Sequence, residues 1–286
     1  MNPILKYRGG KSREIPLFAR YIPNDYNTYL EPFFGGGAVY FYIEPDHAIV
    51  NDINDKLISF YNNVRDDYQA MRIQLDEIQS TYEKNQQLFK ALKKQTPENR
   101  VENKNEALYY LIRDMYNGKT PSTYMDGVLY YFINKIAYSG MIRFNSSGAY
   151  NVPFGRYPNL NTKIITPEHS RLLQQTQIFR LDYADIFAMA DDNDFMFLDP
   201  PYDCIFNDYG NIDMMNGFDE EQHRRLANDF RNLNCRALMI IGKTQLTEEL
   251  YGNLIRDEYF KNYAVNIKNR FKADAKHIVV TNYNPY

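Results

Sequence analysis

The sequence has little cysteine, no tryptophan and no long apolar run. Its two cysteines, Cys204 and Cys235, show no CxxC spacing, so neither a zinc site nor a disulfide framework is predicted. No apolar run reaches about 18 residues, the length that suggests a membrane span. The opening residues MNPILKYRGGKSRE also lack the apolar stretch of a secretory signal. These absences predict a cytoplasmic protein that holds no metal and does not enter a membrane.

Charge is unevenly distributed along the 286 residues. The net charge of −3 does not by itself indicate a nucleic-acid partner. Two stretches, 1–13 and 134–163, nevertheless contain basic residues and no acid. These basic residues are Lys6, Arg8, Lys11 and Arg13 in the first stretch, and Lys135, Arg143, Arg156 and Lys163 in the second. Local stripes of this kind attract phosphates, although an ordinary solvated surface would show the same pattern.

A pattern of alternating strands and helices is present at both ends of the chain and absent from its middle. Residues 54–117 have a mostly helical pattern, and 119–163 are rich in turn residues, with a hairpin turn expected at 146–148. We therefore predict an α/β domain built from residues 1–60 and 165–286, with 61–164 inserted between its two parts. The expected strands are 27–34, 47–52, 178–183, 195–198, 237–241 and 277–282, with helices after Gly37 and at 167–177 and 219–233.

A run of three glycines, in EPFFGGGAVYF, follows one expected strand and opens a helix. Glycines such as Gly35 and Gly37 let the backbone approach a ligand closely, and an ordinary tight turn is the alternative. Asp52 ends the next expected strand, where a carboxylate can accept hydrogen bonds from two ribose hydroxyls or can cap the helix that follows. Together, the glycine run and the acid favour a ligand of the adenosine type.

The stretch DFMFLDPPY, residues 194–202, sends an apolar run directly into an acid, two prolines and a tyrosine. The run FMFL is typical of a buried parallel strand, so Asp199 is expected at the sheet edge where ligands bind. A carboxylate oxygen of Asp199 and the carbonyl of Pro200 can accept the two hydrogens of an exocyclic base amine. Tyr202 can hold the base by stacking, provided that the base is flipped out of its duplex. A proline turn at the edge of a sheet is the alternative interpretation.

Five segments, taken together, resemble a known family: LKYRGGK, YLEPFFGGGAVYF, the ND pair at 51–52, SGMIRFNSSGAYNVPFGRY and LDPPY. They resemble the Dam-type DNA N6-adenine methyltransferases, and their order is similar to the alpha arrangement of that group. The resemblance covers nearly the whole chain and is weakest between about 65 and 115. It implies a Rossmann-like S-adenosylmethionine-dependent methyltransferase sheet with an inserted DNA-recognition module of helices and a β-hairpin.

The resemblance also implies which residues bind the methyl donor. Lys11 would lie near the donor carboxylate and Asp52 would hold the ribose hydroxyls. Relatives usually carry Trp in place of Tyr7 and Phe in place of Tyr183, so these two positions depart from the family pattern. The full set of implied donor contacts is Tyr7, Lys11, Gly35, Gly37, Asp52, Asp182, Tyr183 and Asp199, and the implied catalytic residues are Asp199, Pro200 and Tyr202.

For DNA, residues 138–154 correspond to the recognition hairpin of the family. Arg143 is the candidate for a bidentate guanine contact in the major groove. Arg156 would meet a phosphate, which positions a protein without reading sequence. Relatives often carry Asn in place of Ser139, so that position is a further departure. The full set of implied DNA contacts is Lys6, Tyr138, Ser139, Arg143, Asn145, Pro153 and Arg156.

We therefore predict direct transfer of a methyl group to adenine N6 in double-stranded DNA, at a site containing GAT and similar to GATC. The alternatives are N4-cytosine methylation, against which Asp199 argues, and a non-catalytic DNA-binding regulator, which would not need a complete donor site. We expect a monomer in the cytoplasm of a bacterium or of a phage-infected cell. Any cognate restriction endonuclease is expected to make no stable contact with the chain.

Overall fold

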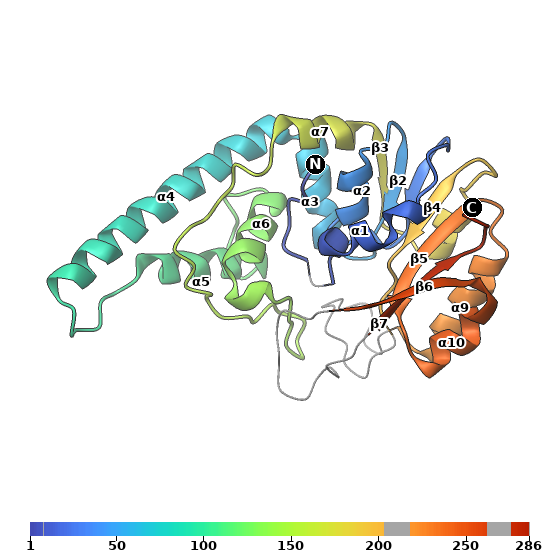
Figure 1. The fold of residues 1–286 in the computed structure, drawn as a ribbon. Coiled ribbons are helices and arrows are strands. Elements are labelled where there is room, and N and C mark those ends of the chain that lie inside the picture. The colour runs from blue at the N-terminus through green and yellow to red at the C-terminus, as the bar shows by residue number, and fades with distance from the viewer. Residues whose placement is uncertain (8, 203–217, 262–275, 286) are drawn as a thin grey trace. The chain divides into compact units, whose positions relative to one another are not determined.

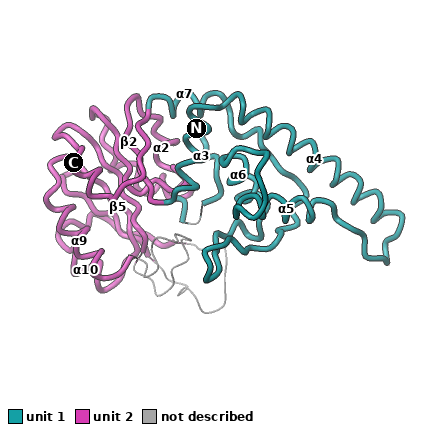
Figure 2. Tube along the Cα trace, turned by 180° about the vertical axis from the view of Figure 1, so that it is seen from behind, with its two compact units in different colours: residues 1–10, 54–175, 208–212 teal, residues 11–53, 176–207, 213–286 magenta. Residues whose placement is uncertain are grey.

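The computed structural model describes residues 1–7, 9–202, 218–261 and 276–285, so Arg8 and Cys204 lie outside the described residues. The described residues divide into two compact units (Figure 2). Unit 1 contains those of 1–10 and 54–175, and unit 2 contains those of 11–53 and 176–286. No helix in the described residues is both long enough and apolar enough to cross a membrane.

Unit 2 is built on a seven-stranded sheet with the strand order β3-β2-β1-β4-β5-β7-β6 (Figure 1). The first five strands in this order run parallel, and β7 pairs antiparallel with both β5 and β6. The predicted α/β, Rossmann-like fold class is therefore confirmed. The strands are β1(Tyr29–Glu31), β2(Ala48–Asn51), β3(Thr176–Phe179), β4(Phe195–Leu198), β5(Arg236–Gly242), β6(Ile255–Phe260) and β7(Lys276–Thr281).

Strand β4 is apolar throughout because both of its faces are covered. Met196 and Leu198 belong to a buried cluster with Leu226 of α9(Glu220–Arg231) and Leu250 of α10(Gln245–Tyr251). On the opposite face, the ring of Phe197 stacks on Phe18 of α1(Ile15–Phe18), with ring centroids 5.7 Å apart. A parallel strand with helices on both faces reads as a continuous apolar run rather than an alternating one.

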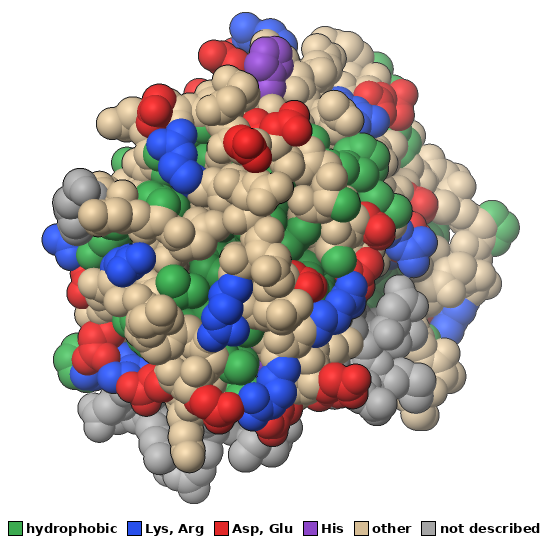
Figure 3. Space-filling view, turned by 90° about the vertical axis from the view of Figure 1, so that its right-hand side faces the viewer, with side chains coloured by type: hydrophobic (Ala, Val, Ile, Leu, Met, Phe, Trp, Pro, Cys, Tyr) green, Lys and Arg blue, Asp and Glu red, His purple; other side chains and the backbone are tan. Residues whose placement is uncertain are grey.

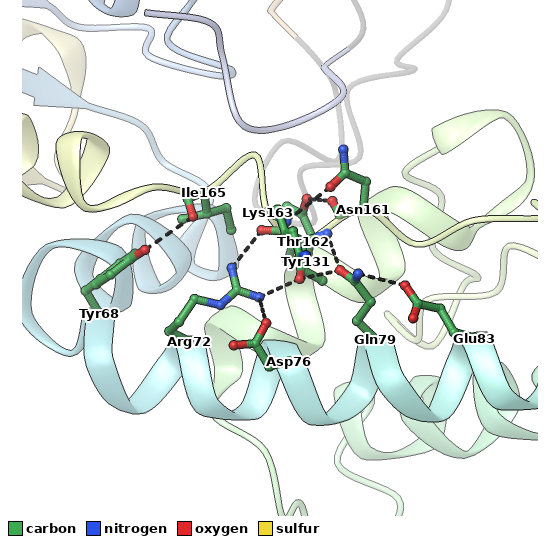
Figure 4. Close-up of polar contacts among 10 residues, drawn as sticks. All are labelled: Tyr68, Arg72, Asp76, Gln79, Glu83, Tyr131, Asn161, Thr162, Lys163 and Ile165. Atoms are coloured by element: carbon green, nitrogen blue, oxygen red, sulfur yellow. Dashed lines mark hydrogen bonds and ion pairs between the residues drawn. The ribbon is translucent and has the colours of Figure 1, made fainter.

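Unit 1 contains the long helix α4(Tyr68–Gln95), which α5(Lys104–Tyr116) contacts. A third helix, α6(Asp126–Ile136), is buried over nearly its whole length. The segment 157–165 runs along α4 and is bonded to it: Gln79 accepts from the backbone N–H and hydroxyl of Thr162, and Arg72 donates to the Thr162 carbonyl (Figure 4). The remaining helices of the unit are α3(Asp55–Asp66) and α7(Pro167–Gln174).

Three of the predicted elements need correction. The strand expected at 178–183 begins at Thr176 and ends at Phe179, because Asp182 caps a short helix, α8(Tyr183–Phe187). The helix expected to reach 177 ends at Gln174, where β3 takes over the chain. Residues 119–163 are less irregular than expected because they include α6. The expected hairpin turn at 146–148 is present, closed by an antiparallel bridge between Phe144 and Tyr150.

Acidic and basic side chains are interspersed on the face of the molecule shown in Figure 3. Ion pairs of this kind within unit 2 include Arg224 with Glu220 and Lys276 with Glu258. Among the described residues of this face, mixed charges give no extended field of one sign.

Candidate functional site

The carboxyl edge of the sheet in unit 2 carries an acid after each of four neighbouring strands. Glu31 ends β1, while Asp52 and Asp199 directly follow β2 and β4, and Asp182 comes three residues after β3. The strand order reverses between β1 and β4, and open α/β sheets bind ligands at such a point. Asp52 and Asp199 are separated by two strand spacings, or about 10 Å, which is a distance that one nucleoside can span.

The glycine run forms the turn between β1 and α2(Ala38–Ile43), and its conformation requires glycine. Gly35 and Gly37 have φ values of 48° and 62°, in the left-handed region. A Cβ on Gly37 would lie 2.8 Å from the Phe34 ring, so a larger residue would also collide there. The Gly35 N–H donates to Asp52 Oδ2 at 2.9 Å, which joins the glycine turn to the acid after β2.

Asn51 is a residue of this edge that sequence reasoning missed. Its buried side-chain amide donates to the carbonyls of Pro32 and Leu181, and its Oδ1 accepts from the Leu181 N–H. One side chain thus fixes the ends of β1 and β2 and the loop before Asp182. The signal in the sequence was its place in the ND pair, one of the five segments that carry the family resemblance.

Lys11 and Asp199 form the closest charged pair of the edge. Lys11 Nζ lies 2.5 Å from both Asp199 carboxylate oxygens, although the two residues are 188 positions apart in the chain. Lys11 is 2% exposed and the Asp199 side chain is 23% exposed, so the acid is the member of the pair that solvent reaches. Lys11 is therefore not part of a surface phosphate-binding stripe, contrary to the interpretation of residues 1–13 as such a stripe.

Tyr202 completes the DPPY turn beside this pair. Its hydroxyl lies 3.4 Å from Asp199 Oδ1, and Lys11 Nζ lies 5.1 Å from the centre of its ring. Pro200, which lies between Asp199 and Tyr202 in the sequence, is buried. The carboxylate, the ammonium group and the aromatic ring are therefore gathered at the end of one strand.

Burial shifts two of the ionisable groups at this edge. It raises the pKa of the Glu31 carboxyl well above its ordinary value, although the Tyr29 hydroxyl donates to Glu31 at 2.7 Å. Burial lowers the pKa of Lys11, and the carboxylate of Asp199 opposes that shift. In the described residues no group of three or more His, Cys, Asp or Glu has an arrangement that could hold a metal ion.

Asp182 and Tyr183 lie at the start of α8, and each has a partner in α9. Asp182 caps α8 by accepting from the Ala184 N–H and forms a bidentate pair with Arg225. Tyr183 is buried, with its ring 5.4 Å from that of Phe33, and its hydroxyl donates to Asp229 at 2.9 Å. Asp229 thus accommodates the hydroxyl by which Tyr183 departs from the phenylalanine of relatives.

The residues predicted to contact DNA all lie in unit 1, and several are joined there. The Asn134 side chain pairs with both the N–H and the carbonyl of Lys6. Lys6 Nζ donates to the Lys135 carbonyl near the end of α6 and lies 4.1 Å from the centre of the Tyr157 ring. Tyr138 follows Lys135 closely in the sequence, and its N–H donates to the Pro153 carbonyl at 2.9 Å.

The hairpin tip is organised by asparagines. Arg143 is exposed, and its Nε donates to Asn151 Oδ1 at 2.9 Å. Asn145 Oδ1 accepts from the N–H groups of Ser147 and Ala149 and so closes the turn. Asn151 was not predicted as a site residue, although it lies in SGMIRFNSSGAYNVPFGRY, one of the segments that carry the family resemblance.

Two of the predicted DNA contacts have unusual backbone angles. Ser139 has φ 54° and Arg156 has φ 55°, and both residues are exposed. Asparagine adopts this left-handed conformation more readily than serine, which gives a physical reason for the asparagine that relatives often carry at position 139. Tyr7 also lies in unit 1, where its carbonyl accepts from the Gly10 N–H.

Comparison with known proteins identifies the family. The family described as D12 class N6 adenine-specific DNA methyltransferase matches residues 7–270. The Type II methyltransferase M.CviBI of Paramecium bursaria Chlorella virus NC1A is 33% identical over 291 residues, which cover 99% of this chain and 100% of that protein. The DNA adenine methylase of Escherichia coli strain K12 is 31% identical over 257 residues, covering 86% of this chain and 83% of that protein. The chain therefore belongs to the D12 class N6 adenine-specific DNA methyltransferases.

Proposed function

We propose that the chain transfers a methyl group from S-adenosylmethionine to N6 of an adenine flipped out of double-stranded DNA, within a site that contains GAT and resembles GATC. Membership of the family makes the chain an adenine-specific DNA methyltransferase and implies this donor. The observation that carries the finer proposal is the pairing of Lys11 with Asp199 beside Tyr202, at the point where the strand order of the sheet reverses.

The residues of the carboxyl edge fit such a donor. Asp52, joined to the glycine turn through Gly35, would accept from the ribose hydroxyls, and the turn leaves no room for a Cβ at Gly37. Among the described residues, Asp52 and Asp199 lie at the same edge as one buried lysine, Lys11, and carboxylates there suit a ligand that carries a sulfonium and an ammonium group. Bound there, the donor would supply an electrophilic methyl group on a good leaving group.

At the target base, Asp199 and the Pro200 carbonyl would accept the two hydrogens of the adenine amine, and Tyr202 would stack on the ring. The amine nitrogen would take the methyl group as the carbon–sulfur bond of the donor breaks, and one amine proton would leave to solvent. Asp199 orients the amine, so positioning supplies much of the rate gain. Lys11 Nζ donates to both oxygens of Asp199, and the carboxylate of the donor would be a further partner for this ammonium group.

We assign DNA recognition to residues 61–164 and catalysis to 1–60 and 165–286. Arg143 would read guanine, and its guanidinium is bonded to Asn151 of the same hairpin. Lys6, Tyr138, Ser139, Asn145 and Pro153 would contact the DNA around the target, and Arg156 would meet a phosphate. We further propose that the chain acts as a monomer.

The experiment is methylation of plasmid DNA with purified protein and S-adenosylmethionine, followed by nucleoside analysis and mapping of the modified bases. N6-methyladenine confined to one motif containing GAT is the expected product. N4-methylcytosine, or no methylated nucleoside, would overturn the reaction. A single adenine motif without GAT would overturn the target sequence and leave the reaction standing. Arg143→Ala should relax the choice of sequence at one position, at about 1–3 kcal/mol of discrimination.

A further inference from the structure

A buried carboxylate with three donors lies behind the DPPY turn. Glu14 is 4% exposed and accepts from His277 Nδ1 at 2.6 Å and from the Tyr259 hydroxyl at 2.9 Å. Lys261 also donates to it. None of these residues belongs to the motifs that define the predicted donor or DNA contacts. With three donors, the Glu14 carboxylate is held in one position, and it in turn orients the His277 ring.

The His277 ring lies against the Tyr202 ring. Their centroids are 5.0 Å apart with planes at 71°, which is an edge contact, and His277 is 1% exposed on strand β7. Gly242 of β5 pairs with His277 in the sheet, and the Tyr202 ring passes over Gly242, about 3.9 Å from the place of a missing Cβ. The Tyr202 ring therefore packs over Gly242 of β5 and against the edge of the His277 ring of β7.

The imidazole is fixed in turn by Glu14. Because a carboxylate accepts from Nδ1, the ring cannot rotate about its χ2 angle without loss of that bond. Nε2 of His277 is buried and has no hydrogen-bond partner among the described residues, so the bond to Glu14 is the polar contact that orients the ring. The short segment from Lys11 to Glu14 therefore touches both ends of the DPPY turn, Asp199 directly and Tyr202 through His277.

We propose that Glu14 and His277 are positioning residues that hold the Tyr202 ring in the orientation in which it stacks on the flipped adenine. This inference rests on the proposed function. Tyr202 contacts the base, while Glu14 and His277 act only through it. A stacking ring that is free to tilt would hold the base in several orientations, and few of them align the amine with the methyl group.

The test compares two substitutions that both remove the hydrogen bond to Glu14. His277→Phe keeps a ring against Tyr202, whereas His277→Leu removes it, and His47→Leu, at an exposed histidine, is the control. Single-turnover methyl transfer is measured at saturating DNA, with the donor Kd measured separately. We expect His277→Leu to slow transfer by about tenfold to a hundredfold with the donor Kd within about twofold, and His277→Phe, which keeps the ring but not the bond to Glu14, to recover only part of the rate.

A merely structural role gives a different pattern, because both variants leave Glu14 short of a donor. Equal slowing by phenylalanine and leucine, or a rate unchanged in both, would overturn the inference. A wild-type protein that transfers no methyl group at all would instead count against the proposed function.

A measurement on the unmodified protein covers the case in which His277→Leu does not fold. The chain has four histidines, so the imidazole nitrogens can be assigned by long-range ¹H–¹⁵N spectroscopy. We expect a proton on Nδ1 of His277, and a shift of the His277 signals, but not those of His47, when DNA containing the mapped target is added. Unchanged His277 signals in the DNA complex would contradict the contact with a stacking Tyr202.

Discussion

At the scale of single residues, Asn51 joins three segments at the carboxyl edge of the sheet with one buried amide. Asn51→Ala leaves the carbonyls of Pro32 and Leu181 without their donor, and each unsatisfied buried group costs about 1–3 kcal/mol. We expect the free energy of unfolding to fall by about 3 kcal/mol and donor affinity to fall with it. Urea unfolding and calorimetry measure the two quantities, with the exposed Asn159→Ala as control. Equal free energies of unfolding for the two variants would show that the hydrogen bonds of Asn51 do not stabilise this part of the sheet.

Ser139 offers a test of backbone conformation, because its φ of 54° is unfavourable for serine. Replacement by glycine or asparagine should raise the free energy of unfolding by up to about 1 kcal/mol. A higher melting temperature, measured without DNA, would report this gain. Ser146→Gly, one turn further along the same hairpin and without a positive φ, should lower stability or leave it unchanged. If Ser146→Gly raised the free energy of unfolding as much as the replacement of Ser139, backbone strain at Ser139 would not explain the gain.

At the scale of elements, the segment 157–165 is fastened to α4 by a row of polar contacts that centre on Thr162 (Figure 4). The Thr162 hydroxyl lies between Arg72, which donates to it, and Gln79, which accepts from it, and the residue is fully buried. Thr162→Val should therefore lower the unfolding free energy by about 1–3 kcal/mol. Thermal unfolding compared with the exposed Thr120→Val is the measurement. A loss no greater than that of the control would mean that solvent replaces these bonds.

Sequence patterns predicted some strands and helices of the fold and missed others. The strands at 195–198 and 237–241 were predicted because strands buried on both faces read as apolar runs. Strand β6 was missed because it is an edge strand whose exposed positions carry charge, as at Arg256 and Glu258. Helix α6 was missed because it is buried nearly all round and so has no polar face to reveal its period.

The positions of Asp52 and Asp199 at strand ends were predictable because each follows an apolar run that is typical of a strand. The partners of those residues were not predictable, because they come from distant parts of the chain. Glu14 and His277 are 263 positions apart, and neither belongs to a recognisable pattern. Asn51 and Asn151 lie in segments that carry the family resemblance, but their bonding partners could be identified only in the structure.

At the scale of the whole molecule, the core contains an unusual number of tyrosines, and 26 occur in the chain. Burial raises the pKa of Tyr109 to about 12 and raises the pKa of Tyr40, Tyr82 and Tyr131 further. In the unfolded chain these phenols ionise near pH 10. Between pH 10 and 12 the folded state therefore binds more protons than the unfolded state, and stability falls as the pH rises.

We expect the protein to unfold cooperatively in that range, with each buried tyrosine contributing up to about 1.4 kcal/mol per pH unit. The chain has no tryptophan, so absorbance at 295 nm reports tyrosinate alone. Buried phenols should ionise together with the loss of the far-ultraviolet circular dichroism signal. Complete ionisation near pH 10 with the circular dichroism intact would contradict the burial of these side chains.

We propose that the reaction depends most on Asp199. The most direct measurement is single-turnover transfer of a labelled methyl group to DNA by the wild type and by Asp199→Ala, with donor binding followed by calorimetry. We predict that the wild type forms N6-methyladenine, and that Asp199→Ala binds the donor at least in part and transfers no methyl group. Equal transfer rates in the two proteins would contradict the central role of the DPPY turn.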